Sequence, residues 1–217
     1  MVLVLLGPPG VGKGTQAVRL ADEMQGAHVS TGDLLRAARR DGTELGARAQ
    51  AFMDAGELVP DDLILDLVRE HLAGIDAERH VLFDGFPRTI PQATGLAEVL
   101  RELGRAVDLV VLFEATDETL VQRLSGRRSC PNCGAVYNVH FNAPETAGEC
   151  DRCGGGLVHR ADDEPGTVRR RLQVYDEQTA PLVSFYENGG APLERVRADR
   201  PVEEVYADFR ALTEVGR

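Results

Sequence analysis

The stretch VLVLLGPPGVGKGTQ, residues 2–16, decides the fold. Residues 2–6 form a continuous apolar run, which is typical of a strand buried on both faces of a parallel sheet. Four glycines follow within residues 7–14, and residues 15–24 then place apolar side chains at helical spacing. A strand, a glycine-rich loop and a helix in this order predict the first half of a βαβ unit.

The loop between strand and helix, GPPGVGKGT at residues 7–15, has the features of a phosphate-binding loop. Its backbone N–H groups can turn inward around phosphate oxygens, and the N-terminus of the next helix faces the same anion. Lys13 is placed to bridge the β- and γ-phosphates of a nucleotide. The general motif has Ser or Thr directly after the lysine, but Gly14 stands there and Thr15 follows. The flanking strand and helix still favour a phosphate site over a plain glycine-rich turn.

Lys13 is the only lysine of the chain, because the other 23 basic residues are arginines. Chance placement in an arginine-biased composition is one explanation. The other is that this position needs a compact ammonium group, which a wide planar guanidinium cannot replace.

Outward from this unit, buried strands and amphipathic helices keep alternating, which predicts a parallel sheet with helices on both faces. The expected strands cover residues 28–30, 81–83, 107–113 and 193–196. The expected helices cover residues 33–40, 44–54, 61–73, 91–103 and 116–124, with a long helix after 165 and a last one from 201. The predicted fold class is therefore α/β, a three-layer sandwich.

Composition narrows the function classes. The 217 residues include 35 acidic and 24 basic side chains, a net charge of −11. This balance argues against non-specific binding to nucleic acid or anionic membranes, although it allows a local basic cleft. No apolar run approaches the roughly 20 residues of a membrane span, and the N-terminus lacks the basic segment of a signal peptide. We expect a cytosolic protein.

The α/β pattern breaks at residue 127, and residues 129–156 are rich in Gly, Pro, Asn and Cys. All four cysteines of the chain lie here in the pattern C-x2-C, sixteen residues, C-x2-C: Cys130, Cys133, Cys150 and Cys153. This spacing predicts a structural zinc site with four thiolate ligands. Disulfides, which a reducing cytosol disfavours, and an iron–sulfur or redox pair are the alternatives. Between the outer cysteines only Arg152 is basic, so no phosphate-tracking surface is visible there.

Two further features point to phosphate chemistry. Asp84 ends a buried strand, where its carboxylate would face the nucleotide and hold Mg²⁺ through water, unless it is a plain turn aspartate. Arginines gather around the cysteine-rich segment: Arg123, Arg127, Arg128, Arg160, Arg169, Arg170 and Arg171. We interpret Arg128, Arg169 and Arg170 as parts of solvated helix faces. Forked cations such as the others stabilise the charge that spreads over phosphate oxygens during phosphoryl transfer.

These motifs together resemble the adenylate kinase family, in its long bacterial form with a zinc-binding lid. The matching segments are GPPGVGKGTQ (7–16), STGDLLR (30–36), DGFPRTIPQ (84–92), RLSGRR (123–128), the two CxxC pairs, HRADD (159–163) and VRRRL (168–172). The match runs essentially from end to end. In this family the ending GKGT is the normal form of the loop, so the departure at Gly14 supports the resemblance.

The resemblance implies reversible Mg²⁺-dependent transfer of the terminal phosphoryl group of ATP to AMP, giving two ADP. It implies a core of residues 1–29, 60–125 and 164–217, a helical AMP-binding insert at 30–59, and a small zinc-ribbon-like β lid at 126–163. The partners would be ATP, AMP and ADP, with Mg²⁺ and a structural Zn²⁺. A monomer without nucleic-acid or membrane partners is expected.

The same resemblance assigns site residues. For AMP it implies Thr31, Arg36, Glu57, Leu58, Val59, Gly85, Phe86, Pro87, Arg88, Gln92, Arg160 and Arg171. For ATP it implies Gly10, Val11, Gly12, Lys13, Gly14, Thr15, Arg123, Arg127, Val136, Tyr137 and, through its backbone, Arg200. The catalytic set would be Lys13, Asp84, Arg88, Arg123, Arg127, Arg160 and Arg171. Gln92 also fits a capping box with Thr89, and Ser30 and Asp33 also fit a helix cap.

Two other functions remain open on the sequence. A kinase for another nucleoside monophosphate would share the core and differ only in the acceptor pocket, where Thr31 and Gln92 favour AMP. A zinc-ribbon module on a phosphate-loop scaffold, acting as a nucleic-acid or regulatory switch, belongs to another class. The acidic balance and the set of arginines weigh against that second function.

Overall fold

The computed structural model describes residues 1–189 and 191–214. Its centre is a sheet of five parallel strands in the order β2 (Ala27–Ser30), β3 (Val81–Asp84), β1 (Val2–Leu6), β4 (Leu109–Glu114) and β7 (Leu193–Arg197). The apolar run at residues 2–6 is thus flanked on both sides, as its composition predicted. Leu5 pairs with Asp84 in the register, which places the end of β3 beside the start of the glycine loop.

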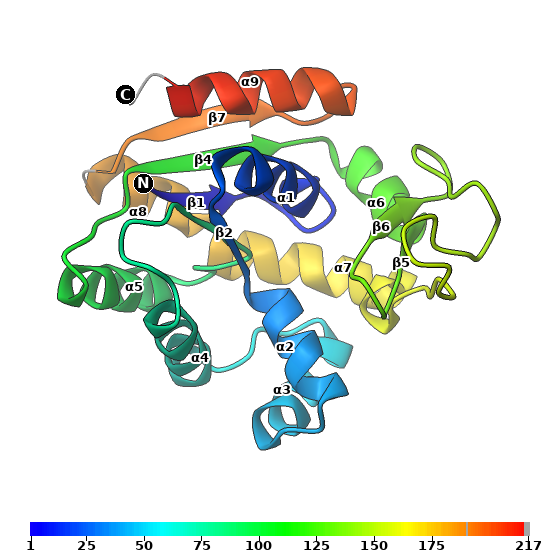
Figure 1. The fold of residues 1–217 in the computed structure, drawn as a ribbon, viewed down its shortest axis with the longest axis horizontal. Coiled ribbons are helices and arrows are strands. Elements are labelled where there is room, and N and C mark those ends of the chain that lie inside the picture. Colours follow the sequence, from blue (N-terminus) through cyan, green and yellow to red (C-terminus); the bar gives the residue numbers. More distant parts are fainter. Residues whose placement is uncertain (190, 215–217) are drawn as a thin grey trace.

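Side chains of β1 alternate between two separate cores, because successive residues of a strand point to opposite faces. Val2, Val4 and Leu6 pack with α4 (Asp61–Ala73), α5 (Ile90–Glu102) and α8 (Pro181–Gly189). Leu3 and Leu5 pack with α1 (Lys13–Met24) and α9 (Val202–Glu214). Figure 1 shows the resulting three layers, so the predicted sandwich is confirmed.

A helical insert, residues 30–59, projects from the sheet and carries α2 (Thr31–Arg40) and α3 (Glu44–Ala55) (Figure 1). Both helices begin at a capping hydroxyl: Ser30 accepts a hydrogen bond from the N–H of Asp33, and Thr43 accepts one from Gly46. Such caps satisfy backbone donors that the first helical turn leaves unpaired. The cap predicted at Ser30 is therefore present.

A cysteine module, residues 126–163, follows α6 (Asp117–Ser125) on another side of the molecule (Figure 1). Its regular structure is one short antiparallel pair, β5 (Arg127–Ser129) with β6 (Val136–Asn138), and a 3-10 turn, η1 (Ala161–Asp163). Turns and isolated bridges connect the rest. The small β module expected from the break at residue 127 is confirmed.

The long helix expected after residue 165 is interrupted. The structure has α7 (Pro165–Val174), a π-helical turn η2 (Tyr175–Thr179) and then α8. At the junction the N–H of Ala180 bonds to the carbonyl of Tyr175, one residue beyond the α-helical partner. Pro181 explains the change, since it has no N–H and its ring crowds the preceding turn.

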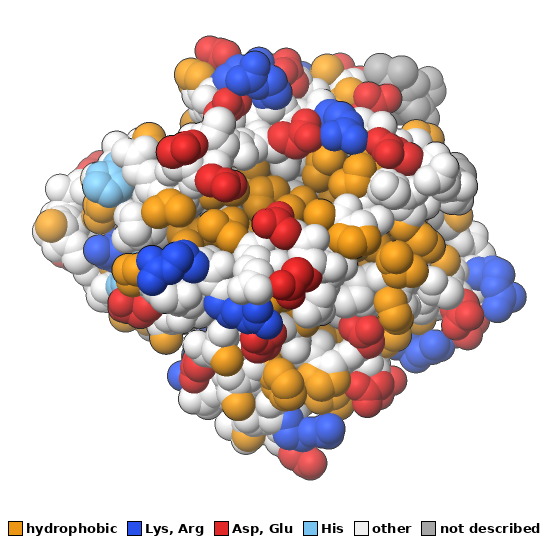
Figure 2. Space-filling model, turned by 180° about the vertical axis from the view of Figure 1, so that it is seen from behind, with side chains coloured by type: hydrophobic (Ala, Val, Ile, Leu, Met, Phe, Trp, Pro, Cys, Tyr) orange, Lys and Arg blue, Asp and Glu red, His pale blue; other side chains and the backbone are white. Residues whose placement is uncertain are grey.

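Within the described residues, no helix is long and apolar enough to cross a membrane. Figure 2 shows acidic and basic side chains interspersed over one face of the molecule, without a broad area of one sign. That face offers no extended basic surface of the kind that follows a nucleic-acid backbone.

Candidate active site

The glycine loop closes around the one lysine of the chain. Lys13 is the first residue of α1, and its Nζ donates hydrogen bonds to the carbonyl oxygens of Gly7 (2.6 Å) and Pro8 (3.0 Å). The loop backbone turns at Gly12, whose φ of 108° lies in the left-handed region that favours glycine. The ammonium group therefore sits inside the loop, where a phosphate would contact it.

The charge of Lys13 is costly in this place. The pKa of Lys13 is lowered to about 8, chiefly by burial and also by the nearby cations Arg88, Arg171 and Arg127, while Asp84 opposes the shift. A bound polyanion would reverse both effects, because it replaces lost solvation and offsets the repulsion. The electrostatics of the loop thus indicate an anion site.

Asp84 lies at the end of β3, close to the loop. Its Oδ2 is 3.4 Å from Nε2 of His28. Burial alone would raise the pKa of Asp84, but the hydrogen bond with His28 and the charge of Lys13 hold it below its usual value. A Cβ at Gly14 would lie 3.0 Å from Asp84 Oδ2, so the Asp84 carboxylate would have to shift if the Ser or Thr of the general motif stood there. The carboxylate is ionised and is an oxygen ligand of the kind Mg²⁺ takes.

Three partly buried arginines surround the same space. Burial lowers the pKa of Arg88, Arg160 and Arg171; neighbouring cations lower it as well, while nearby carboxylates oppose the shift. These residues come from three separate segments: the loop after β3, the end of the cysteine module, and α7. The structure therefore brings together cations that lie far apart in the sequence.

Two aspartates that the sequence analysis did not single out hold Arg127 and Arg171 in place. Asp163 is fully buried and binds Arg127 with both oxygens (2.5 and 2.7 Å). Arg171 contacts the same carboxylate at 3.0 Å and Asp162 at 2.9 Å. Paired carboxylates that orient guanidinium forks keep them fixed for a ligand. The adjacent acids within HRADD were the available signal.

A cavity beside the arginines gathers most of the expected acceptor residues. It is lined by Thr31, Gly32, Leu35, Arg36, Met53, Gly56, Glu57, Leu58, Val59, Ile64, Gly85, Arg88, Gln92, Asp162 and Arg171. Thr31 donates from its hydroxyl to the carbonyl of Gly85 at 2.9 Å, which joins the insert to the loop after β3. This cavity lies between the helical insert and the core.

Gln92 serves two purposes. Its backbone N–H bonds to the Thr89 hydroxyl at 3.2 Å, so this half of the predicted capping box is present. The side chain is also buried and fixed at both ends: Oε1 accepts from the N–H of Arg88, and Nε2 donates to Asp61, each at 2.7 Å. A locked amide on a cavity wall can read the edge of a base.

On the other side of the loop lies the expected donor region. Arg123 donates to the carbonyls of Val11 (2.9 Å) and Ala198 (2.7 Å), which fixes its guanidinium between two loops. A flat, fixed guanidinium is a platform on which an aromatic base can stack. Val136 is 44% exposed on the cysteine module.

Three expected site residues have side chains that point elsewhere. Phe86 is fully buried in the core, with its ring 6.0 Å from that of Phe83. Tyr137 is buried inside the cysteine module. The Arg200 side chain forms an ion pair with Asp208 of α9, which leaves its backbone for any ligand contact. Sequence position alone did not fix these directions.

Arg170, interpreted as part of a solvated face, instead bonds to Glu57 at 2.6 Å. This ion pair links α7 to the end of the helical insert. Both side chains are partly exposed, so the pair contributes little stability by itself.

The four cysteines form one cluster. Their Sγ atoms all lie within 4.8 Å of one another, and two pairs, Cys130 with Cys153 and Cys133 with Cys150, are 3.5 Å apart. Disulfide sulfurs would be about 2.05 Å apart, whereas a tetrahedral zinc with bonds of about 2.3 Å places sulfurs about 3.8 Å apart. The donor set and the spacing therefore fit a metal ion.

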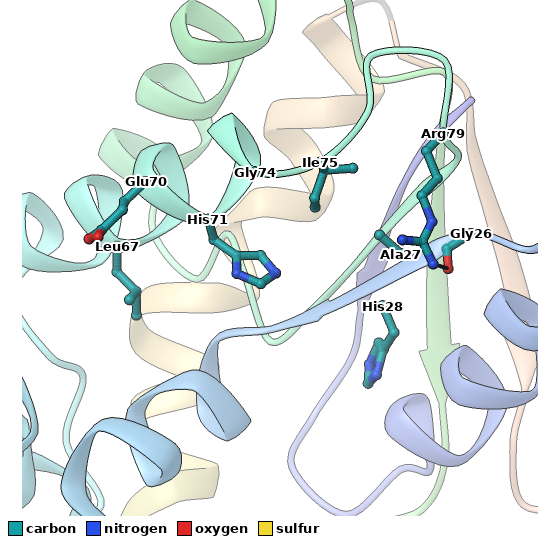
Figure 3. Close-up of a pocket in the computed structure, with 9 residues that line it drawn as sticks. All are labelled: Gly26, Ala27, His28, Leu67, Glu70, His71, Gly74, Ile75 and Arg79. Atoms are coloured by element: carbon teal, nitrogen blue, oxygen red, sulfur yellow. Dashed lines mark hydrogen bonds between the residues drawn. The ribbon is translucent and has the colours of Figure 1, made fainter. Parts of the chain in front are cut away.

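A larger cavity, of about 710 Å³, lies away from this chemistry (Figure 3). It sits between the edge strand β2 and the end of α4, lined by residues such as Ala27, His71 and Arg79. Arg79 bonds there to the carbonyls of Gln25 and Gly26. Of the residues that line this cavity, His28 is the one that contacts Asp84. The larger of the two cavities is therefore not the candidate active site.

A glycine loop around a lysine, at the carboxyl ends of parallel strands, defines the class of phosphate-loop nucleotide-binding proteins. Comparison with known proteins identifies the family. The family model described as adenylate kinase matches residues 5–191. The chain is 48% identical to the adenylate kinase of Symbiobacterium thermophilum over 217 residues, which is 100% of both chains. It is 49% identical to that of Exiguobacterium sibiricum and 47% identical to that of a Geobacillus species, each over 212 residues and 98% of both chains. The chain belongs to the adenylate kinase family.

Proposed function

We propose that the protein transfers the terminal phosphoryl group of Mg-ATP to AMP reversibly, giving two ADP. The observation that carries the proposal is the set of partly buried cations between two sites, the acceptor cavity and the Arg123 platform. A site that must hold two phosphate chains end to end needs charge of this kind at its middle. Family membership supports the same reaction.

For the acceptor we assign the residues expected from the sequence. Arg36 and Arg88 would clamp the AMP phosphate. Gln92 would read the adenine edge, and residues 57–59 and 85–87 would supply the backbone walls. Thr31 would fix the insert to the loop after β3. The domain division follows: residues 30–59 as the AMP-binding insert, 126–163 as the lid, and the remainder as the core.

For the donor, the backbone of residues 10–15 would cradle the phosphates with Lys13 at their centre. Arg123 would support the adenine, with backbone of residues 136–137 and 200 nearby. Arg127, Arg160 and Arg171 would surround the group in transfer. Asp84 would hold the Mg²⁺ of Mg-ATP through water, and the ion would neutralise charge on the β- and γ-phosphates.

The reaction asks little acid–base chemistry of the protein, because a phosphate acceptor is already a nucleophile near neutral pH. The side chains would align the two phosphates and stabilise charge on the moving group. They must also exclude water, which would otherwise accept the phosphoryl group. Asp162 and Asp163 would keep the module and α7 arginines aimed at the site before the substrates arrive.

The four cysteines would hold a structural Zn²⁺. Four thiolates complete a tetrahedron, so no position remains for water or substrate. Thiolate ligands stay reduced in a reducing compartment, which supports a cytosolic location for the protein. We propose that the protein is a monomer.

The test is steady-state phosphoryl transfer from Mg-ATP to AMP, GMP, CMP and UMP. We expect AMP to exceed the others in kcat/KM by at least about 100-fold, as a site that hydrogen-bonds one base rejects others strongly. Preference for a second nucleotide would reassign the acceptor. Absence of transfer to all four, combined with salt-sensitive retention of RNA or DNA on a filter, would replace the proposal with the nucleic-acid switch.

A further inference from the structure

We propose that the hydroxyl of Tyr137 donates a hydrogen bond to the Cys150 thiolate, and that this bond strengthens metal retention in the cysteine module. Tyr137 is thus a positioning residue for the metal site. The proposal rests on the metal-binding role proposed for the four cysteines. It does not depend on which nucleotide accepts the phosphoryl group.

The direction of the bond follows from the two contacts of one oxygen. Tyr137 Oη lies 2.9 Å from the N–H of Asp151, which can only donate. It lies 3.6 Å from Cys150 Sγ, within the range of hydrogen bonds to sulfur. Because the hydroxyl accepts from Asp151, its own proton is available for Cys150. A thiolate bound to metal has no proton, so it must be the acceptor.

The surroundings keep the hydroxyl in this position. Tyr137 is 7% exposed and packs in the small core of the module with Cys130, Ala135 and Cys150. Water therefore has little access to compete for the proton. A hydrogen bond that is shielded from solvent is stronger than the same bond at the surface.

Four thiolates around a divalent cation leave an excess of negative charge, which hydrogen bonds to sulfur disperse. Backbone N–H groups supply such bonds here: those of Asn132 and Cys133 to Cys130, and those of Arg152 and Cys153 to Cys150. Among the described residues, Cys150 also has the hydroxyl of Tyr137. Partners of this kind fix ligand geometry, and losing one commonly weakens metal affinity 10- to 100-fold.

The position of Tyr137 also links the metal to the candidate active site. Tyr137 lies in β6, and β6 pairs with β5 so that Tyr137 stands opposite Arg128 and Asn138 opposite Arg127. The Asn138 side chain bonds to the carbonyl of Arg123 at 2.8 Å. The metal therefore supports β6, and this strand lies beside two arginines of the candidate active site, Arg123 and Arg127.

The experiment compares Tyr137→Phe with wild type and with Tyr186→Phe. Phenylalanine keeps the ring and removes only the hydroxyl. Tyr186 is a matched control, because its buried hydroxyl has no hydrogen-bond partner among the described residues and lies in the main core. Each protein is loaded with Zn²⁺, and zinc transfer to a chromophoric chelator is timed. Each is also loaded with Co²⁺, whose thiolate charge-transfer absorption reports the electron density on sulfur.

We expect Tyr137→Phe to release zinc at least about 10-fold faster than wild type, with the Co²⁺ charge-transfer band at lower energy. Its melting temperature should fall in the loaded form and stay near wild type after metal removal. Tyr186→Phe should match wild type in release rate and in the cobalt band.

Three results would overturn the proposal. One is unchanged release and an unchanged cobalt band in Tyr137→Phe. Another is an equal loss of melting temperature with and without metal, since the hydroxyl would then serve packing alone. The third is failure of the wild-type chain to bind Zn²⁺ or Co²⁺, which would remove the metal site while leaving the acceptor-panel result untouched. If Tyr137→Phe did not fold, amide exchange of Asp151 in wild type would decide. Protection that is the same with and without metal would count against the bond.

Discussion

The helical insert and the cysteine module must both be held in place beside the core, and they differ in what holds them. Each is a small projection that carries arginines to the candidate active site. The insert extends the main core, because Leu35, Ala49 and Val59 are buried in the same cluster as β1 and α5. The module has its own cluster of a few residues, and half of its buried members are cysteines. One projection is held by apolar packing, whereas the other needs a metal to replace a core that it is too small to form.

Metal removal should break this comparison most strongly, because a structural zinc site contributes on the order of 10 kcal/mol to folding of its module. After zinc is stripped with a thiol-reactive mercurial, residues 126–163 should lose amide protection while residues 30–59 keep it. The melting temperature should fall, and turnover at low temperature should partly survive. Hydrogen exchange with mass spectrometry, zinc quantification and calorimetry measure this. Unchanged melting with abolished turnover would mean that the metal is catalytic.

Leu35→Ala tests the other half of the comparison. Leu35 is buried in the main core, so we expect a loss of about 2–5 kcal/mol in the free energy of unfolding of the whole chain. Denaturant unfolding measures it. Val139→Ala, an exposed position in the module, is the control and should change little. A Leu35→Ala protein that unfolds only within residues 30–59 would show the insert to be an independent unit.

Lys13→Arg tests the glycine loop, the part of the candidate active site that both projections face, and shows whether their arginines can replace the function of its lysine. The variant keeps the charge, but a wide guanidinium does not fit between Gly7 and Pro8 carbonyls that bind the ammonium at 2.6 and 3.0 Å. We expect kcat to fall at least about 100-fold, roughly 2.7 kcal/mol. Coupled assay of ADP formation measures it, with melting temperature as the folding control. Near-normal turnover would remove Lys13 from the phosphate site.

Arg88→Ala should affect the insert side of the site more than the module side. Loss of one charge-assisted contact with phosphate costs about 1.5–3 kcal/mol. We expect that loss in kcat/KM for AMP, with a smaller change for ATP. Two-substrate kinetics separate the two values. Equal losses for both nucleotides would place Arg88 at the group in transfer and not at the acceptor.

The smallest expected effect is the uptake of a fraction of a proton when a nucleotide binds. Burial lowers the pKa of Lys13 to about 8, and a bound nucleotide should raise it again. Binding of a Mg²⁺-bound, non-hydrolysable ATP analogue should therefore take up protons at pH 8.5 and fewer at pH 6.5. Calorimetry in buffers of different ionisation enthalpy measures this uptake, and Lys13→Met should abolish the part of it that is due to Lys13. Uptake that persists in Lys13→Met would assign the proton to an arginine.

Without a nucleotide, the lowered pKa of Lys13 makes the stability of the protein depend on pH, because the folded form holds this proton less tightly than the unfolded form. Stability should rise from pH 8 toward 10.5, because the unfolded lysine still binds a proton there.

The contrast between the two projections also marks the limit of prediction from sequence. The strand at residues 2–6, the helix over residues 61–73 and the caps at Ser30 and Thr89 follow from local patterns, and the structure has them. The strands, helices and caps depend on residues close in sequence. The sulfur cluster joins residues 17 and 23 positions apart, but the repeated C-x2-C pattern predicted it.

What sequence reasoning missed depends on distant partners. The carboxylate of Asp163 binds Arg127 and Arg171, which lie up to 36 positions away in the sequence. Glu57 binds Arg170, which lies 113 positions away. The hydroxyl of Tyr137 faces Cys150, a contact that the sequence analysis did not predict. The direction of a side chain follows from packing of the finished fold. No periodicity in the sequence carries that information.

The single lysine has a practical consequence for chemical labelling. Apart from the terminal amine, Lys13 is the one primary amine that an acylating reagent can modify in the chain. Because its pKa is about 8, roughly half of it is in the neutral, reactive form at that pH, against well under 1% of an ordinary lysine. A nucleotide in the loop would both cover this amine and restore its proton. Acylation followed by peptide mapping would then report the occupancy of the phosphate loop from one modified residue.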